Sequence, residues 1–231
     1  MMKHRTTGFS LTEVLLAVAT LTIGMVFIGG TFFVGMHYST RSVEQGMGAV
    51  VAREAVSLIR LYGVDLTDPN LSTDKAVDFA MVAPAALPSD TFVYQYNPQY
   101  RWDAVCQRVP GTTNLIAVTV FISRWIGDED NPPRLRTLDV TVDDRFLDPD
   151  QGGILSQGSQ VVDGQDIRRI YAVTRSQADA TDGVRWELVP EPNRVDPGGT
   201  LDEIWTVAPD ATGSTGTESR IVYVTKDEIR F

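Results

Sequence analysis

Residues 8–38 read GFSLTEVLLAVATLTIGMVFIGGTFFVGMHY, and the only formally charged side chain among them is Glu13. Residues 14–40 carry no formal charge, and as a helix they would be about 40 Å long, more than the ~30 Å hydrocarbon layer of a bilayer. An ordinary secretory leader has an apolar stretch of only about 7 to 15 residues. The stretch therefore predicts one membrane-spanning helix rather than a removable signal of the usual kind.

The residues before this stretch are basic. Residues 1–7 carry Lys3 and Arg5 and no acid. Positive charge beside a membrane span tends to stay in the cytoplasm. We therefore expect a cytoplasmic amino terminus, with everything after residue 40 on the far side of the membrane.

Glu13 is unusual because it stands one turn into an apolar helix. A carboxylate costs about 2.5 to 3.5 kcal/mol at the centre of a bilayer and less near its surface. Two interpretations follow from the position alone. Either the side chain reaches the membrane surface, or a positively charged partner offsets its burial.

Residues 8–17, GFSLTEVLLA, resemble the cleavage and methylation motif of type IV pilins and type II secretion pseudopilins at every diagnostic position. The resemblance implies a leader peptide of residues 1–8, which a prepilin peptidase in the membrane removes by cutting after Gly8. The same peptidase would then methylate the new amino group of Phe9. It further implies that Glu13 faces the positive amino terminus of a neighbouring subunit, which would offset the burial of its charge.

The resemblance also implies a location and a set of partners. The subunit would cross the inner membrane once with its head in the periplasm, and after assembly would stand in a periplasmic or cell-surface filament. Its partners would be the prepilin peptidase, other pilin or pseudopilin subunits, and the inner membrane. A glycine at position 8 suits the cut, because it lets the backbone enter a narrow cleft.

The apolar helix lacks the proline that many major pilins carry and has four glycines instead: Gly24, Gly29, Gly30 and Gly35. Glycine loosens a helix in water by about 1 kcal/mol relative to alanine, but in a membrane it lets helices approach closely. Ordinary helix packing and bending during transfer from bilayer to filament both remain open.

The helix is expected to continue beyond the membrane as an amphipathic one. After Arg41, apolar residues recur every three or four positions, at Val43, Met47, Val51, Ala55, Leu58, Ile59 and Tyr62. Gly63 is a plausible stop. We predict a helix over residues 9–62, with a membrane or filament-core part at 9–40 and an amphipathic part at 41–62.

Residues 63–148 predict a β-rich head that packs on this helix, and the fold class is α+β. After a loop at 64–90 with a short helical turn near 75–81, β-branched and aromatic runs predict antiparallel strands at 91–96, 100–108, 114–125 and 134–142. Residues 149–231 predict a β-rich extension with strands at 165–174, 184–189, 203–208 and 220–226. This extension is either a second module or an elaboration of the first sheet, with a boundary near residue 148.

Composition argues against several functions. Lys plus Arg number 20 against 30 Asp plus Glu, a net charge of −10, which disfavours nucleic acid as a partner. Cys106 is the only cysteine, so no internal disulfide or thiolate metal cluster can form. His4 and His37 have no Cys, Ser or carboxylate cluster at ligand or triad spacing. We expect no enzymatic activity, no cofactor and no metal site of these kinds.

Several other residues are candidate binding sites. Two acidic clusters, at 128–131 and 143–150, could supply oxygen ligands to calcium, but neither has a calcium-loop register, and acidic turns are usually just solvated. Cys106 is expected to be buried as a small apolar group. The tryptophans are expected in the core or on sheet faces rather than in ligand platforms; they are Trp102, Trp125, Trp186 and Trp205.

The sequence therefore predicts a structural subunit, a minor pilin or minor pseudopilin, of a type IV pilus or a type II secretion pseudopilus. The longer head and the absence of a cysteine pair favour a minor subunit over a major one. One alternative is a bitopic envelope protein whose β head binds a ligand or surface and never polymerises. An anchored hydrolase is a third hypothesis, disfavoured because the mature chain keeps only His37.

Overall fold

The structure is a computed structural model that describes residues 10–126, 133–139, 146–147, 160–175, 186–189, 203–208 and 218–231. It divides into two units, residues 1–44 and residues 45–231. One long apolar amino-terminal helix and two antiparallel sheets make up the described chain, which confirms the α+β class.

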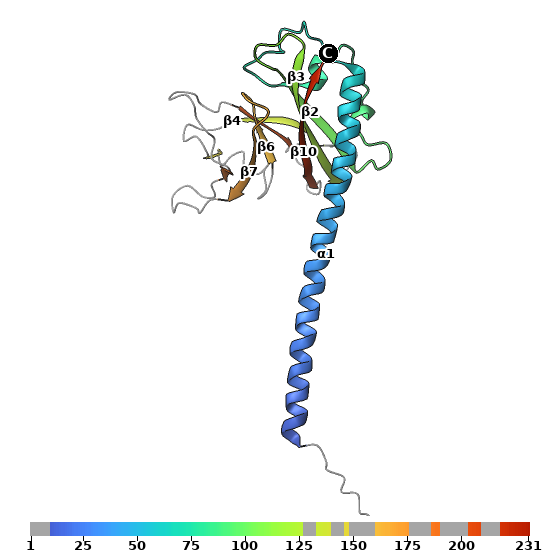
Figure 1. The fold of residues 1–231 in the computed structure, drawn as a ribbon, viewed down its shortest axis with the longest axis vertical. Helices are drawn as coiled ribbons and strands as arrows, with labels where there is room; N and C mark the ends of the chain where they lie inside the picture. Colours follow the sequence, from blue (N-terminus) through green and yellow to red (C-terminus); the bar gives the residue numbers. More distant parts are fainter. Residues whose placement is uncertain are drawn as a thin grey trace, which may run out of the picture. The chain divides into compact units, whose positions relative to one another are not determined.

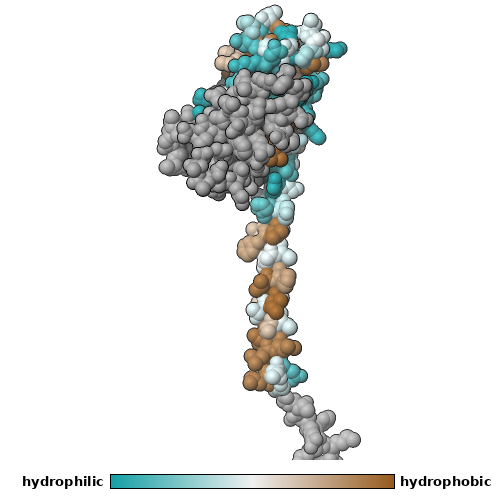
Figure 2. All heavy atoms as spheres, turned by 90° about the vertical axis from the view of Figure 1, so that its left-hand side faces the viewer, coloured by the Kyte–Doolittle hydropathy of each residue, from teal (hydrophilic) through white to brown (hydrophobic). Residues whose placement is uncertain are grey.

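Helix α1 spans Leu11–Tyr62, 52 residues. It ends where the sequence predicts, because Gly63 takes a φ of 80° that a side chain disfavours, and its N–H donates to the carbonyl of Ile59 at 2.9 Å. In the first unit its apolar side chains are exposed; Leu16, Phe27 and Phe33 are 70%, 71% and 72% exposed. Figure 2 shows this apolar surface in brown.

The remainder of α1 belongs to the second unit and is amphipathic. Val51, Ala55 and Ile59 have no exposed surface, and Met47 and Leu58 pack against the same core. These five residues confirm the predicted apolar stripe. Its two ends lie outside the core, since Val43 is 63% and Tyr62 39% exposed.

This face of α1 packs on a four-stranded antiparallel sheet in the order β1-β2-β3-β10, seen beside the cyan end of the helix in Figure 1. The strands are β1 (Val77–Asp78), β2 (Tyr100–Arg108), β3 (Leu115–Ile126) and β10 (Glu218–Arg230). Strands β2 and β3 confirm the predictions at 100–108 and 114–125. Strand β10 is longer than the predicted 220–226 and pairs along β3 from Glu218 opposite Ile126 to Arg230 opposite Leu115.

The connection between α1 and β2 differs from the prediction at residues 91–96. These residues do not form a strand: a 3-10 helix, η1, spans Ser89–Phe92, and only the single bridge from Val93 to Arg101 follows it. The indole N–H of Trp102 donates to the carbonyl of Thr91 at 2.9 Å, so a tertiary contact fixes the turn. The predicted helical turn near 75–81 is present, slightly later, as α2 (Phe79–Val82).

The second sheet has six strands in the order β4-β9-β6-β7-β8-β5, and its described pairs are antiparallel. Its strands are β4 (Arg134–Asp139), β5 (Phe146–Leu147), β6 (Gln160–Asp163), β7 (Ile170–Arg175), β8 (Trp186–Val189) and β9 (Glu203–Ala208). Strand β6 was not predicted. The strand predicted at 165–174 begins only at Ile170, because residues 164–169 form the turn between β6 and β7.

The two sheets do not divide the chain at residue 148. Strand β4, from the predicted head, lies in the second sheet, whereas β10, from the predicted extension, lies in the first. Between the sheets, the face of the first sheet that points away from α1 packs on the second through a core that includes Val105, Phe121, Val162 and Ile167. The carboxyl-terminal half of the chain is therefore interleaved with the head.

Candidate functional site

The start of α1 is built by a reciprocal cap that joins Ser10 and Glu13. The N–H of Ser10 donates to Oε2 of Glu13 at 3.1 Å, and the Oγ of Ser10 accepts from the N–H of Thr12 at 3.2 Å. The first helical hydrogen bond runs from the N–H of Val14 to the carbonyl of Ser10, also at 3.2 Å. This is the arrangement of a capping box, in which serine and a glutamate three residues later satisfy the free N–H groups of the first turn.

The cap gives Glu13 a stabilising contact within its own chain. A carboxylate in the first turn lies at the positive end of the helix dipole, which favours its charge. The cap also holds the Glu13 side chain at the amino-terminal end of α1. Gly8 and Phe9, the residues predicted for cleavage and methylation, precede this end and lie outside the described residues. Ser10 was missed as a site residue, although the Ser-x-x-Glu spacing is a recognisable signal.

The threonine side chains farther along α1 suit an apolar medium. The hydroxyls of Thr20, Thr22, Thr31 and Thr40 each donate to a carbonyl four residues earlier, at 2.8 to 3.0 Å. A hydroxyl satisfied by its own helix does not need water. By length and composition, α1 can cross a membrane.

The four glycines of the apolar segment leave open space on the helix. A Cβ added at Gly24, Gly29, Gly30 or Gly35 would meet nothing within 4 Å. No contact within the described part of the chain therefore requires glycine there. Close approach of another helix remains one of the two interpretations of these positions.

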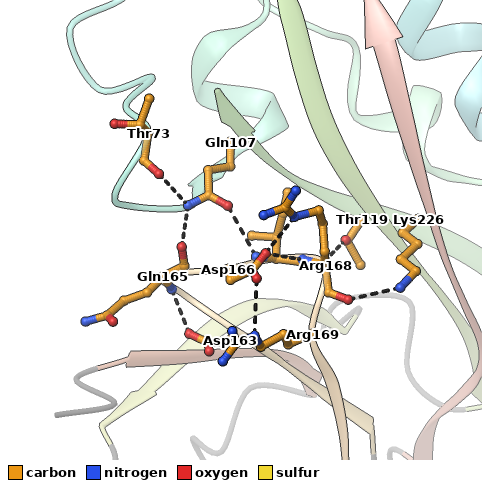
Figure 3. Close-up of polar contacts among 10 residues, drawn as sticks. Thr73, Gln107, Thr119, Asp163, Gln165, Asp166, Arg168, Arg169 and Lys226 are labelled. Atoms are coloured by element: carbon orange, nitrogen blue, oxygen red, sulfur yellow. Dashed lines mark hydrogen bonds and ion pairs between the residues drawn. The ribbon is translucent and has the colours of Figure 1, made fainter. Parts of the chain in front are cut away.

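A second polar cluster joins the two sheets in the head, and Gln107 stands at its centre (Figure 3). Its Nε2 donates to the carbonyl of Thr73 at 3.0 Å and to that of Gln165, while its Oε1 accepts from the N–H of Ile167 at 3.3 Å. Thr119 adds a bond from its Oγ1 to the carbonyl of Ile167 at 2.6 Å. Two side chains of the first sheet thus hold the turn at 164–169 through its backbone.

Backbone contacts at Gly164 strengthen this junction. The N–H of Ala76 donates to the carbonyl of Gly164 at 2.7 Å, and the N–H of Gly164 donates to the carbonyl of Glu203 at 2.9 Å. A Cβ at residue 164 would lie 2.7 Å from that carbonyl oxygen, so the approach requires glycine. The Nζ of Lys75, which precedes Ala76, lies 3.3 Å from Oε2 of Glu203.

Asp103 is a buried carboxyl on β2. Its Oδ2 is buried and has no hydrogen-bond partner among the described residues, and burial raises the pKa of the Asp103 carboxyl from 3.8 to about 7. The neighbouring charges are mixed: Arg101 and Arg134 act to lower this pKa, whereas Asp78 acts to raise it. A single buried carboxyl with these neighbours is an ordinary structural arrangement.

Cys106 and Trp102, two of the other candidate residues, both lie in the core. Cys106 is fully buried, as expected, and burial raises the pKa of its thiol, which leaves it unreactive. Trp102 is 2% exposed and packs between Phe79 and Phe92, so it is a core residue. The side chain of Trp186 lies outside the described residues, and so do the acidic residues of both clusters, those at 128–131 and those within 143–150. Across the part of the chain that is described, no three His, Cys, Asp or Glu side chains come together.

No protein-family model, curated protein or solved structure matches this chain. The inference of function therefore depends on the chain's own residues. The amino-terminal arrangement is the strongest candidate site: basic residues at positions 3 and 5 and a glycine at position 8 precede the capped Glu13 and the exposed apolar part of α1.

Proposed function

We propose that this chain is a structural subunit, a minor pilin or minor pseudopilin, of a type IV pilus or a type II secretion pseudopilus. Its leader of residues 1–8 is cut after Gly8 by a prepilin peptidase, Phe9 becomes the methylated amino terminus, and α1 serves first as membrane anchor and then as filament core. The β head stays in the periplasm or on the filament surface.

The observation that carries the proposal is the motif at 8–17 joined to an apolar helix whose side chains are exposed in the described part of the first unit. Exposed apolar surface of this extent is costly in water, at about 25 cal/mol per Å². Lipid covers it before assembly, and the helices of adjoining subunits cover it afterwards.

The geometry of Glu13 suits an exchange of partners. In the single chain its carboxylate accepts a hydrogen bond from Ser10 and lies at the positive helix end. In a filament the free amino group of a neighbouring Phe9 offers a full positive charge, which is a stronger partner than a neutral N–H. The gain from this exchange favours assembly over the isolated membrane state.

Two measurements on the full-length chain test the proposal. Mass spectrometry of the mature protein is expected to find methylated Phe9 as its first residue. Glu13→Ala is expected to reduce incorporation into sheared filaments at least about tenfold, the effect of 1.4 kcal/mol, with membrane insertion intact. Thr22→Ala, farther along the same helix and outside the motif at 8–17, is the control and is expected to assemble normally.

Three results would contradict the proposal. Retention of residues 1–8 in the mature protein would remove the processing step on which it depends. Equal incorporation of Glu13→Ala and the unsubstituted chain would show that Glu13 has no part in assembly. Filaments that lack the chain altogether would favour a bitopic envelope protein that does not polymerise.

A further inference from the structure

Strand β10 is an edge strand of the first sheet, because among the described strands it pairs in that sheet with β3 alone. The N–H of Phe231, which follows the strand, donates to the carbonyl of Asn114 at 2.9 Å, and the register continues unbroken from there back to residue 223. Residues of an antiparallel strand alternate between bonding the neighbouring strand and facing away from it. The backbone groups of Val224, Lys226 and Glu228 therefore point to the outer edge of the sheet.

This outer edge is open over a short length and closed at both ends. The N–H of Glu228 donates to Oδ1 of Asp227 at 2.9 Å, so a side chain satisfies it. At the other end the register of β10 shifts after Ile221, and a shift of this kind bends a strand and interrupts its edge. Between these ends, no other backbone group in the described part of the chain bonds the outward N–H and C=O of Val224 or Lys226.

A groove of about 360 Å³ lies between this stretch of β10 and α1. On the helix it is lined in part by Ala49 and Ala52, whose small side chains leave space beside the strand. Lys226 also lines it, although its ammonium donates to the carbonyl of Arg168 at 3.2 Å, on the face of the sheet that turns away from α1 (Figure 3). Lys226 therefore borders the groove with its backbone, and the open edge faces space rather than a packed side chain.

One charge in the groove lacks an opposite charge. Arg60 is neutralised, since its Nη2 lies 2.8 Å from Oδ2 of Asp227. Arg53 makes no ion pair in the described part of the chain, and no acid stands three or four residues from it on the helix. A peptide laid along the edge would bring some of its side chains over α1, where an acidic one would meet Arg53.

We propose that the open edge of β10 takes up an extended segment of a different subunit of the filament, which pairs with Val224 and Lys226 as an added strand. In such contacts backbone hydrogen bonds supply the affinity and side-chain contacts the specificity. Ala49 and Ala52 leave room for the segment, and Arg53 selects one with an acidic residue. The inference rests on the proposed function, since a minor subunit is surrounded by subunits of other kinds.

Photo-cross-linking of the full-length chain in filament-forming cells identifies the segment. A p-benzoylphenylalanine replaces Ser57, an exposed residue of α1 that lines the groove. The same amino acid in place of Tyr96, which is 80% exposed and does not line the groove, is the control. Peptide sequencing of the cross-links in sheared filaments is expected to find one segment of a different processed subunit at Ser57, at least fivefold above its yield from Tyr96.

A proline substitution separates backbone pairing from side-chain contact. Lys226→Pro removes an N–H that points away from β3, so the bonds between β10 and β3 remain. It is expected to lower the cross-link yield from Ser57 at least fivefold. Lys226→Ala removes the side chain but keeps the N–H, and is expected to leave the yield unchanged. Thermal unfolding of both variants in detergent checks that they fold alike.

Hydrogen exchange of the unsubstituted chain tests the pairing without any change in folding. The amides of Val224 and Lys226 are expected to exchange at least about tenfold more slowly in sheared filaments than in detergent, because the added strand bonds them. The amide of Thr225 points to β3 in both states and is the internal reference. This measurement decides the question if Lys226→Pro fails to fold.

Three results would refute strand addition: equal cross-link yields from Ser57 and Tyr96, equal yields from Lys226→Pro and Lys226→Ala, or unchanged exchange at Val224 and Lys226. A cross-link from Ser57 to a second copy of this chain would refute a different subunit as the partner. Processing after Gly8 and incorporation are measured in the same samples. Where both occur, these results overturn the strand-addition inference alone, and where neither occurs, the filament proposal itself is wrong.

Discussion

At the scale of single residues, Asp103 makes the stability of the head depend on pH. Its pKa in the folded chain, about 7, lies above the ordinary 3.8, so folding favours the protonated form. Ionisation therefore costs free energy in the folded state only, and stability is lost as the pH rises from about 4 through 7. The cause is the burial of the carboxyl, which Arg101 and Arg134 offset only in part.

Asp103→Asn removes this ionisation and is expected to stabilise the protein at pH 8, by at most about 4 kcal/mol. The advantage should shrink toward zero below about pH 4, where the carboxyl is protonated in both the folded and the unfolded chain. Thermal unfolding of the full-length chain in detergent, followed by tryptophan fluorescence from about pH 3 to 8, measures the pH dependence of both proteins. Asp90→Asn, at an exposed aspartate, is the control. Parallel curves for wild type and Asp103→Asn would contradict the assigned burial cost.

At the scale of elements, the packing of α1 on β10 depends on Gly48, and Gly46, two residues earlier on the same helix, serves as a comparison. A Cβ at Gly48 would lie 2.6 Å from the Cβ of Tyr223, whereas a Cβ at Gly46 would meet nothing within 4 Å. Gly48→Ala is therefore expected to destabilise the head by about 1 to 3 kcal/mol, because strand and helix must separate. Gly46→Ala is expected to be neutral or to stabilise α1 by up to about 1 kcal/mol.

Chemical denaturation of the two alanine variants, with equal m-values as a check on two-state behaviour, gives the comparison. Both substitutions raise helix propensity equally, so only the contact with β10 separates them. Equal stability of Gly48→Ala and Gly46→Ala would show that α1 does not approach β10 at this point.

The elements that were predictable from sequence are those whose pattern is set locally. The end of α1 at Gly63, the apolar stripe through Val51 and Ile59, and strands β2 and β3 follow from periodicity and turn residues. The strand predicted at 91–96 failed because Trp102 binds the carbonyl of Thr91 and holds a turn, a contact no local pattern contains. Strand β6 was missed because its pairing with β9 depends on the close approach of Gly164 to Glu203.

The candidate sites likewise include residues that local sequence reveals and residues that only the fold brings together. Glu13 stands out in the sequence because charge is rare in an apolar run, and Ser10 could have been found from its spacing to Glu13. The sheet junction at Gln107 could not be found from sequence, because Gln107 and Ile167 are 60 residues apart and only the packing of the two sheets brings them together.

At the scale of the whole second unit, Gln107 decides whether the two sheets behave as one body. Its amide bonds the carbonyls of Thr73 and Gln165 and the N–H of Ile167, so truncation removes the partner of the buried Ile167 N–H. Gln107→Ala is expected to cost about 1 to 3 kcal/mol, whereas Gln99→Ala, at an exposed position, should cost little.

Hydrogen exchange distinguishes a loosened junction from general destabilisation. In Gln107→Ala, amides of β6 and β7 should exchange faster while those paired between β2 and β3 keep their protection, because the first sheet retains its own core on α1. Uniform acceleration over both sheets would mean that they unfold together and that Gln107 contributes only to overall stability. Unchanged exchange in β6 and β7 would mean that the apolar contacts of Val105, Phe121 and Ile167 hold the sheets together without it.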